Sequence, residues 1–147
     1  MSESNAFSFT IDHVELFVPD RSHAAAWYAR VLACRPVPGT EQWATHPQGP
    51  LMLSPDGGRT KLALFVGEPQ GSRSTAGFHR VAFRLDGQEW LAFVAGLAEL
   101  GLEEGAGAAR VVDHTEAWSV YFTDPFGHHL EVTTYDADVV RQARGGA

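Results

Sequence analysis

Two short runs of the chain alternate apolar and polar residues with a period of two, and each leads into a helical pattern. Residues 11–18 read Ile-Asp-His-Val-Glu-Leu-Phe-Val, and residues 77–83 read Gly-Phe-His-Arg-Val-Ala-Phe. Such alternation is typical of a strand with one face on the core. Each run has a histidine at its third position and an aspartate seven residues after that histidine. This correspondence predicts an internal repeat.

A helix is predicted after each run. Apolar residues recur there at intervals of three and four, and an aspartate precedes each segment as a suitable N-cap, Asp20 for the first helix and Asp86 for the second. Gly101 is expected to end the second helix. The apolar positions are Ala24, Trp27, Tyr28, Val31 and Leu32 in the first helix, and Trp90, Phe93, Val94, Leu97 and Leu100 in the second.

Three further strand-like segments follow each helix, so each half of the chain is predicted to be β-α-β-β-β in a fold of the α+β class. We expect one domain over residues 10–136, with repeat one at 10–68, repeat two at 77–136, and a tail at 137–147. Residues 67–76 are rich in Gly, Ser and Pro and are expected to link the halves. The six shorter strands are predicted at 34–38, 50–53 and 60–67, and at 108–113, 117–123 and 128–135.

Composition and charge narrow the function classes. A length of 147 residues with 44% hydrophobic content suits a single globular domain. One cysteine, Cys34, excludes an intrachain disulfide and a cysteine-based metal site, which fits a reducing compartment. We see no secretory signal and no membrane-spanning run, so we expect a cytoplasmic protein without a membrane partner. The net charge of −7 and scattered arginines argue against nucleic acid as a partner.

Strand alternation sorts the side chains of the first run by face. His13 and Glu15 share one face, whereas Val14 and Leu16 take the other. We expect the apolar face to pack beneath the helices. The His13 face is then left on the opposite, concave side of the sheet.

A carboxylate on the last predicted strand completes a candidate metal centre. Glu131 shares its strand face with His129 and Thr133. His13 and His79 occupy equivalent strands of the two repeats, so a pseudo-twofold axis would bring them close together. Two imidazoles and one carboxylate form a facial triad, which leaves about three positions of an octahedral ion free for substrate and oxygen. This donor set is the one expected of a non-haem Fe(II) oxygenase.

A longer motif near the C-terminus points to a family. It reads Val112-x-His114-x5-Val120-Tyr121-x2-Asp124-Pro125-x-Gly127-x3-Glu131. Residues 10–136 resemble the vicinal oxygen chelate superfamily, which includes glyoxalase I, extradiol ring-cleaving dioxygenases, fosfomycin-resistance thiol transferases, methylmalonyl-CoA epimerase and bleomycin-binding proteins. The motif is similar to the signature of the extradiol dioxygenases.

The resemblance implies a fold and roles for individual residues. Paired βαβββ modules are expected to form an open, barrel-like mixed sheet with helices on its outer face, around a divalent metal. His13, His79 and Glu131 fall on the ligand positions. Tyr121 matches the active-site tyrosine that hydrogen-bonds the substrate, and His114 matches the histidine that supports it.

The chain also departs from these families on the strand at residues 61–66. The dioxygenases carry an acid–base histidine there, and this chain has none, which leaves His46, His114 or Glu15 as alternatives. Glyoxalase I and the epimerase place a fourth ligand, Glu or Gln, on the same strand. This chain has neither residue there before Glu68, which argues against a four-ligand site. The fosfomycin transferases carry a threonine where this chain has Glu15.

We therefore expect a metal-dependent extradiol-type dioxygenase that acts on a catecholic or related vicinal-oxygen molecule. Fe(II) is favoured because it passes electron density to oxygen, whereas Mn(II), Ni(II) and Zn(II) are alternatives. Two other functions stay open: a non-redox lyase, isomerase or thiol transferase, and a non-catalytic drug- or metabolite-binding protein. The resemblance also implies a homodimer, and whether the site closes within one chain or across two is left open.

Overall fold

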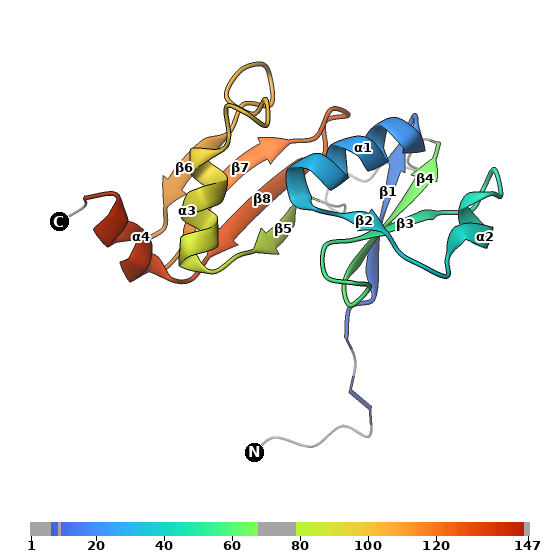
Figure 1. Cartoon of the computed structure of the whole chain (residues 1–147), viewed down its shortest axis with the longest axis horizontal. Coiled ribbons are helices and arrows are strands. Elements are labelled where there is room, and N and C mark those ends of the chain that lie inside the picture. Colours follow the sequence, from blue (N-terminus) through green and yellow to red (C-terminus); the bar gives the residue numbers. More distant parts are fainter. Residues whose placement is uncertain (1–6, 9, 68–78, 146–147) are drawn as a thin grey trace. The chain divides into compact units, whose positions relative to one another are not determined.

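The computed structural model describes residues 7, 8, 10–67 and 79–145 and divides into two compact units (Figure 1). Unit 1 is Met1–Gln70 and unit 2 is Gly71–Ala147. The predicted linker at 67–76 lies outside the described residues except for Gly67. The helices of the described residues include none long and apolar enough to cross a membrane.

Unit 1 is a four-stranded mixed sheet covered by one long helix. Its strands lie in the order β1-β4-β3-β2, with β1 parallel to β4 and the other neighbours antiparallel. Helix α1 packs against β4 and β2. The elements are β1 His13–Val18, α1 Arg21–Leu32, β2 Arg35–Pro36, α2 Glu41–Ala44, β3 Leu51–Ser54 and β4 Lys61–Val66.

Unit 2 repeats the same topology. Its strands lie in the order β5-β8-β7-β6, again with the first and last strands of the repeat parallel. Helix α3 packs against β8 and against α4. The elements are β5 Val81–Arg84, α3 Gly87–Ala95, β6 Arg110–Asp113, β7 Trp118–Thr123, β8 His129–Thr134 and α4 Ala137–Ala143. The α+β class and the βαβββ repeat are confirmed, and each repeat forms its own four-stranded sheet.

The helix starts follow from the predicted caps. Asp20 Oδ1 accepts the backbone N–H groups of Ser22 at 2.9 Å and His23 at 3.1 Å, and Asp86 Oδ1 accepts that of Glu89 at 2.8 Å. These bonds satisfy amide donors that have no partner within the first turn of a helix. Both helices therefore begin directly after the aspartates predicted as their N-caps.

One face of each sheet is buried under its helix. In β1 the side chains of Leu16 and Val18 are 3% and 0% exposed, whereas His13 and Glu15 lie on the exposed face, as predicted. In unit 2, the Trp90 indole N–H of α3 donates to the Val132 carbonyl of β8 at 3.0 Å. The opposite face of each sheet, which we call its open face, carries the candidate functional residues.

Several boundaries differ from the sequence expectation. Helix α3 ends at Ala95, because Gly96 begins a series of turns in which the Gly101 backbone takes a positive φ of 74°. Strand β5 begins at Val81, two residues after His79. Helices α2 and α4 were not predicted, since four and seven residues are too few to show a helical apolar pattern.

Candidate functional site

His13 is held between two carboxylates on the open face of unit 1. Its Nδ1 lies 2.8 Å from an Asp12 carboxylate oxygen and its Nε2 lies 3.0 Å from a Glu15 carboxylate oxygen. The hydrogen bond to Asp12, followed by that to Glu15, raises the pKa of His13 above its ordinary value. Lys61 Nζ donates to the other Asp12 oxygen at 2.9 Å, so the carboxylate that orients His13 is itself fixed.

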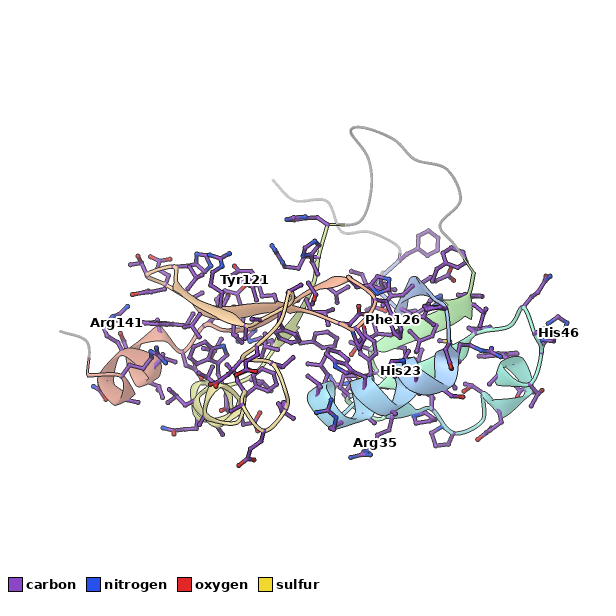
Figure 2. The ribbon with its side chains drawn as sticks, turned by 90° about the horizontal axis from the view of Figure 1, so that it is seen from above. His23, Arg35, His46, Tyr121, Phe126 and Arg141 are labelled. Carbon is purple, nitrogen blue, oxygen red and sulfur yellow. The ribbon has the colours of Figure 1, made fainter. Side chains whose placement is uncertain are left out.

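A cavity of about 580 Å³ opens beside His13 within unit 1. Trp43 of α2 lines it, whereas Phe65 is not among its lining residues and lies against Phe17. His46 does not line the cavity either and projects from the loop after α2 (Figure 2). The lining consists of Asp12, His13, Glu15, Val37, Thr40, Trp43, Pro50, Met52, Gly58 and Lys61. The cavity has an apolar body and a charged end at His13.

Glu131 lies on the open face of unit 2, in the middle of strand β8. The Ser119 hydroxyl donates to its carboxylate at 2.7 Å, and Ser119 also lies 2.9 Å from the Thr133 hydroxyl. Tyr121 of β7 lies directly opposite Glu131 in the strand register. Side chains at opposite positions of an antiparallel pair are neighbours on the same face. The sheet therefore positions the predicted ligand and the predicted active-site tyrosine side by side.

Tyr121 and His114 are joined by a hydrogen bond. The Tyr121 hydroxyl lies 2.7 Å from His114 Nε2, with the two rings nearly perpendicular at 89°. His114 follows β6, so the bond connects a loop to the sheet. The contact fixes the direction of the phenolic oxygen, and the two residues matched to the dioxygenase motif are in contact.

Two arginines contact the ring of Tyr121. The guanidinium carbon of Arg80, just before β5, lies 4.5 Å from the ring centroid, and that of Arg110 on β6 lies 5.4 Å from it. Both contacts are within the range of cation–π attraction. Sequence reasoning missed both residues. In the run at residues 77–83 it considered His79, and not Arg80, as the functional residue.

The face alternation of β5 explains the position of Arg80. Ala82 pairs with Glu131, while Val81 and Phe83 pair with the buried Leu130 and Val132. Arg80 is therefore in phase with Ala82 and the open face. His79 is exposed and lies beyond the paired strand, with its ring centroid 6.1 Å from that of His129.

The turn before β8 is fixed by a buried acid. Asp124 accepts the backbone N–H groups of Phe126 and His128, each at 2.9 Å, and Gly127 takes a positive φ of 97°. The Asp-Pro-x-Gly sequence thus shapes the turn. The His128 side chain is only 19% exposed, and its Nδ1 lies 2.6 Å from the Asp124 carboxylate.

The predicted metal ligands come from both units, His13 from unit 1 and His79 and Glu131 from unit 2. Within each unit, the described residues bring together no group of three His, Cys, Asp or Glu side chains able to hold an ion. The three-ligand centre therefore stays a prediction.

The individual donors fit a divalent ion. Histidines that bind metals usually donate their second ring N–H to a carboxylate or a carbonyl group, and Asp12 stands in that relation to His13 Nδ1. Its Nε2, which would face the ion, contacts Glu15 in this structure. The Ser119 hydroxyl anchors one oxygen of the Glu131 carboxylate, which leaves the second oxygen to bind an ion. Imidazole and carboxylate donors of this kind suit Fe(II), Mn(II) and Zn(II).

Solved structures share this fold at low sequence identity. Virulence protein STM3117 from Salmonella typhimurium is 27% identical, with 88% of this chain and 98% of that chain covered and a TM-score of 0.58. The fosfomycin resistance protein FosX from Listeria monocytogenes is 16% identical, with 91% and 99% covered and a TM-score of 0.62. Oxidase ChaP-H2 is 18% identical, with 87% and 94% covered and a TM-score of 0.60. No curated protein sequence matches the chain significantly.

The sequence itself matches a family. The family model of the Glyoxalase/Bleomycin resistance protein/Dioxygenase superfamily covers residues 10–132, which include both repeats through most of β8. With its duplicated βαβββ topology, the chain belongs to the Glyoxalase/Bleomycin resistance protein/Dioxygenase superfamily.

Proposed function

We propose that the protein is a divalent-metal-dependent enzyme that acts on a small molecule with two adjacent oxygens, by extradiol-type dioxygenation of a catecholic substrate. The ligands in this proposal are His13, His79 and Glu131, with Fe(II) as the favoured ion. The observation that carries the proposal is the 2.7 Å contact between His114 and Tyr121, with Tyr121 opposite Glu131 on the sheet. An oriented phenol beside a candidate ligand is able to hydrogen-bond a substrate oxygen close to the proposed ion.

Tyr121 would bind a substrate oxygen. Its hydroxyl can accept one hydrogen bond while donating another, so the bond to His114 leaves capacity for a bond to a substrate oxygen. Because His114 fixes the phenolic oxygen in advance, the substrate need not order it on binding. This role is one of positioning and of hydrogen bonding at a developing charge.

His13, Asp12 and Glu15 would form the charged end of the substrate cavity. Asp12 fixes the ring orientation of His13, and Glu15 is the acid–base candidate that also lines the cavity. The apolar lining, with Trp43 and Met52, suits the ring of an aromatic substrate. When bound, the metal would supply Lewis acidity toward the two substrate oxygens and redox chemistry toward oxygen.

Oxygen consumption tests the reaction. The full chain, loaded anaerobically with Fe(II), should consume oxygen with simple catechols, and Tyr121→Phe should lower kcat by about 10²-fold while leaving metal content unchanged. Tyr135→Phe is the matched control, since Tyr135 is 61% exposed and lies after β8. Absence of oxygen uptake with Fe(II), together with turnover of another substrate under Ni(II), Zn(II) or Mn(II), would exclude the dioxygenase.

Two other functions remain as outcomes of the same experiments. The fosfomycin resistance protein shares the fold, and a non-redox thiol transferase, lyase or isomerase would use the same ion without oxygen uptake. A binding protein without turnover is favoured by Arg80, because its positive charge lies on the same sheet face as Glu131 and would repel a divalent cation bound there. The proposal includes a homodimer, which light scattering of the purified chain would test.

A further inference from the structure

The open face of unit 2 is basic, although the chain as a whole carries a net charge of −7. Arg84 and Arg110 are strand residues of this face, and the Arg80 guanidinium reaches it from just before β5. Glu131 is the acidic residue among the described strand positions of the face. Three of the ten arginines therefore gather where the described strands offer one carboxylate.

Arg80 and Arg110 approach Tyr121 from different sides of its strand. The order β5-β8-β7-β6 places Arg110 on the strand next to β7 on one side and Arg80 beyond β8 on the other. Both guanidinium carbons lie within 5.4 Å of the centroid of the Tyr121 ring. At physiological salt, where the screening length is about 8 Å, two such charges still act together on a ligand placed at this ring.

These two guanidinium groups are not neutralised by the described part of the chain. Its ion pairs include neither Arg80 nor Arg110. The polar contact of Arg80 is its 3.4 Å approach to His79 Nε2, and its Nε is buried without a hydrogen-bond partner. A guanidinium that stacks on a ring uses its flat face, so the donors at its edge stay directed sideways toward an acceptor.

We propose that Arg80 and Arg110, on the two sides of Tyr121, form a binding site for the oxyanion of a small ligand. A carboxylate suits it best, because the planar guanidinium fork matches two coplanar oxygens. The ring of Tyr121, labelled in Figure 2, holds both cations in place for this purpose. In terms of the proposed function, the substrate would carry a negative charge, but the oxyanion site itself needs no metal.

Binding of benzoate and benzamide to the metal-free full chain tests this site. The two probes have nearly the same size and shape and differ in charge, and nuclear magnetic resonance titration measures both affinities. Benzoate should bind at least about fivefold more tightly than benzamide and should change the chemical shifts of Arg80, Arg110 and Tyr121. Inorganic phosphate, titrated in parallel, shows whether a tetrahedral oxyanion is accepted as well, and tighter binding of phosphate than of benzoate would reject the preference for carboxylate.

Charge-removing variants locate the effect. Arg80→Gln and Arg110→Gln should each weaken benzoate binding about fivefold or more and leave benzamide unchanged. Arg84→Gln is the matched control, because Arg84 lies on the same face but about 13 Å along the strand from Arg80 and stacks on Tyr135. Circular dichroism confirms that each variant is folded.

Two results would overturn the proposal: equal affinity for benzoate and benzamide, including no detectable binding of either, or an equal loss in Arg84→Gln. Neither result depends on metal loading or oxygen uptake, so a failure here is distinct from a failure of the proposed dioxygenase.

Discussion

Replacement of Asp124 by alanine should unfold the turn that leads into β8. The Asp124 side chain is fully buried, at 0% exposure, yet it is a carboxylate. Its Oδ1 accepts two backbone N–H groups, from Phe126 and His128, and its Oδ2 lies 2.6 Å from the imidazole of His128. Glu131 follows three residues after His128, so this turn sets the entry of the candidate ligand into the strand.

The expected cost follows from these contacts. A hydrogen bond to a charged group contributes roughly 1.5–3 kcal/mol, and a buried donor left without a partner costs roughly 1–3 kcal/mol. The losses overlap, because water still reaches part of the His128 ring, whose side chain is 19% exposed. We therefore expect Asp124→Ala to lower the free energy of unfolding by about 3–5 kcal/mol. Asp124→Asn keeps an acceptor for both backbone N–H groups and should lower it by about 1–2 kcal/mol.

Urea unfolding followed by tryptophan fluorescence measures these differences. Asp138→Ala is the control, since the Asp138 side chain is 95% exposed and its ion pair with Arg141 is a surface contact. That variant should change the free energy of unfolding by less than about 0.5 kcal/mol. Equal stability of Asp124→Ala and Asp138→Ala, or of the asparagine and alanine variants of Asp124, would show that the buried carboxylate does not hold the turn.

Three further predictions follow from local structure. Asp12→Asn should lower the pKa of His13, as measured by nuclear magnetic resonance titration of the metal-free protein. Because the pKa of His13 is raised in the folded state, protonated His13 contributes its full stability below pH about 6.5. This contribution is lost as the pH rises through the raised pKa. Burial raises the pKa of Cys34 to about 12, so mass spectrometry should find it unmodified by iodoacetamide at pH 8 until urea is added. Gly87→Ala should lower the free energy of unfolding by about 1–3 kcal/mol, since a Cβ there would lie 2.9 Å from side-chain atoms of Asp136 and Val139.

Local patterns predicted much of the fold. Asp20 and Asp86 cap their helices as expected because an N-cap depends on a few adjacent residues. The faces of β1 were predicted because alternation is a property of the strand alone. The helices α2 and α4 are too short for a periodic signal in the sequence. Helix α4 is stabilised by packing, as Val140 shows with 0% exposure, whereas α2 buries none of its residues.

The candidate site was predicted less completely. The pairing of His114 with Tyr121 agrees with the motif that named both. Arg80 escaped notice because the two repeats were aligned on the equal spacing from histidine to capping aspartate, although β5 presents the neighbouring residue to the open face. A shift of one residue in a strand exchanges its faces. The excess of positive charge on the open face depends on which strands are neighbours, and this was visible only in the sheet order.

The metal content of the protein decides whether His13, His79 and Glu131 hold an ion. After loading with Fe(II) and desalting without oxygen, the wild-type chain should hold about one metal equivalent, as measured by inductively coupled plasma mass spectrometry. Glu131→Ala and His13→Ala should each hold less than about a tenth of an equivalent, whereas His23→Ala, in the exposed first turn of α1, should match the wild type. A full equivalent retained by folded Glu131→Ala, or a wild-type chain that binds no divalent metal, would contradict the account.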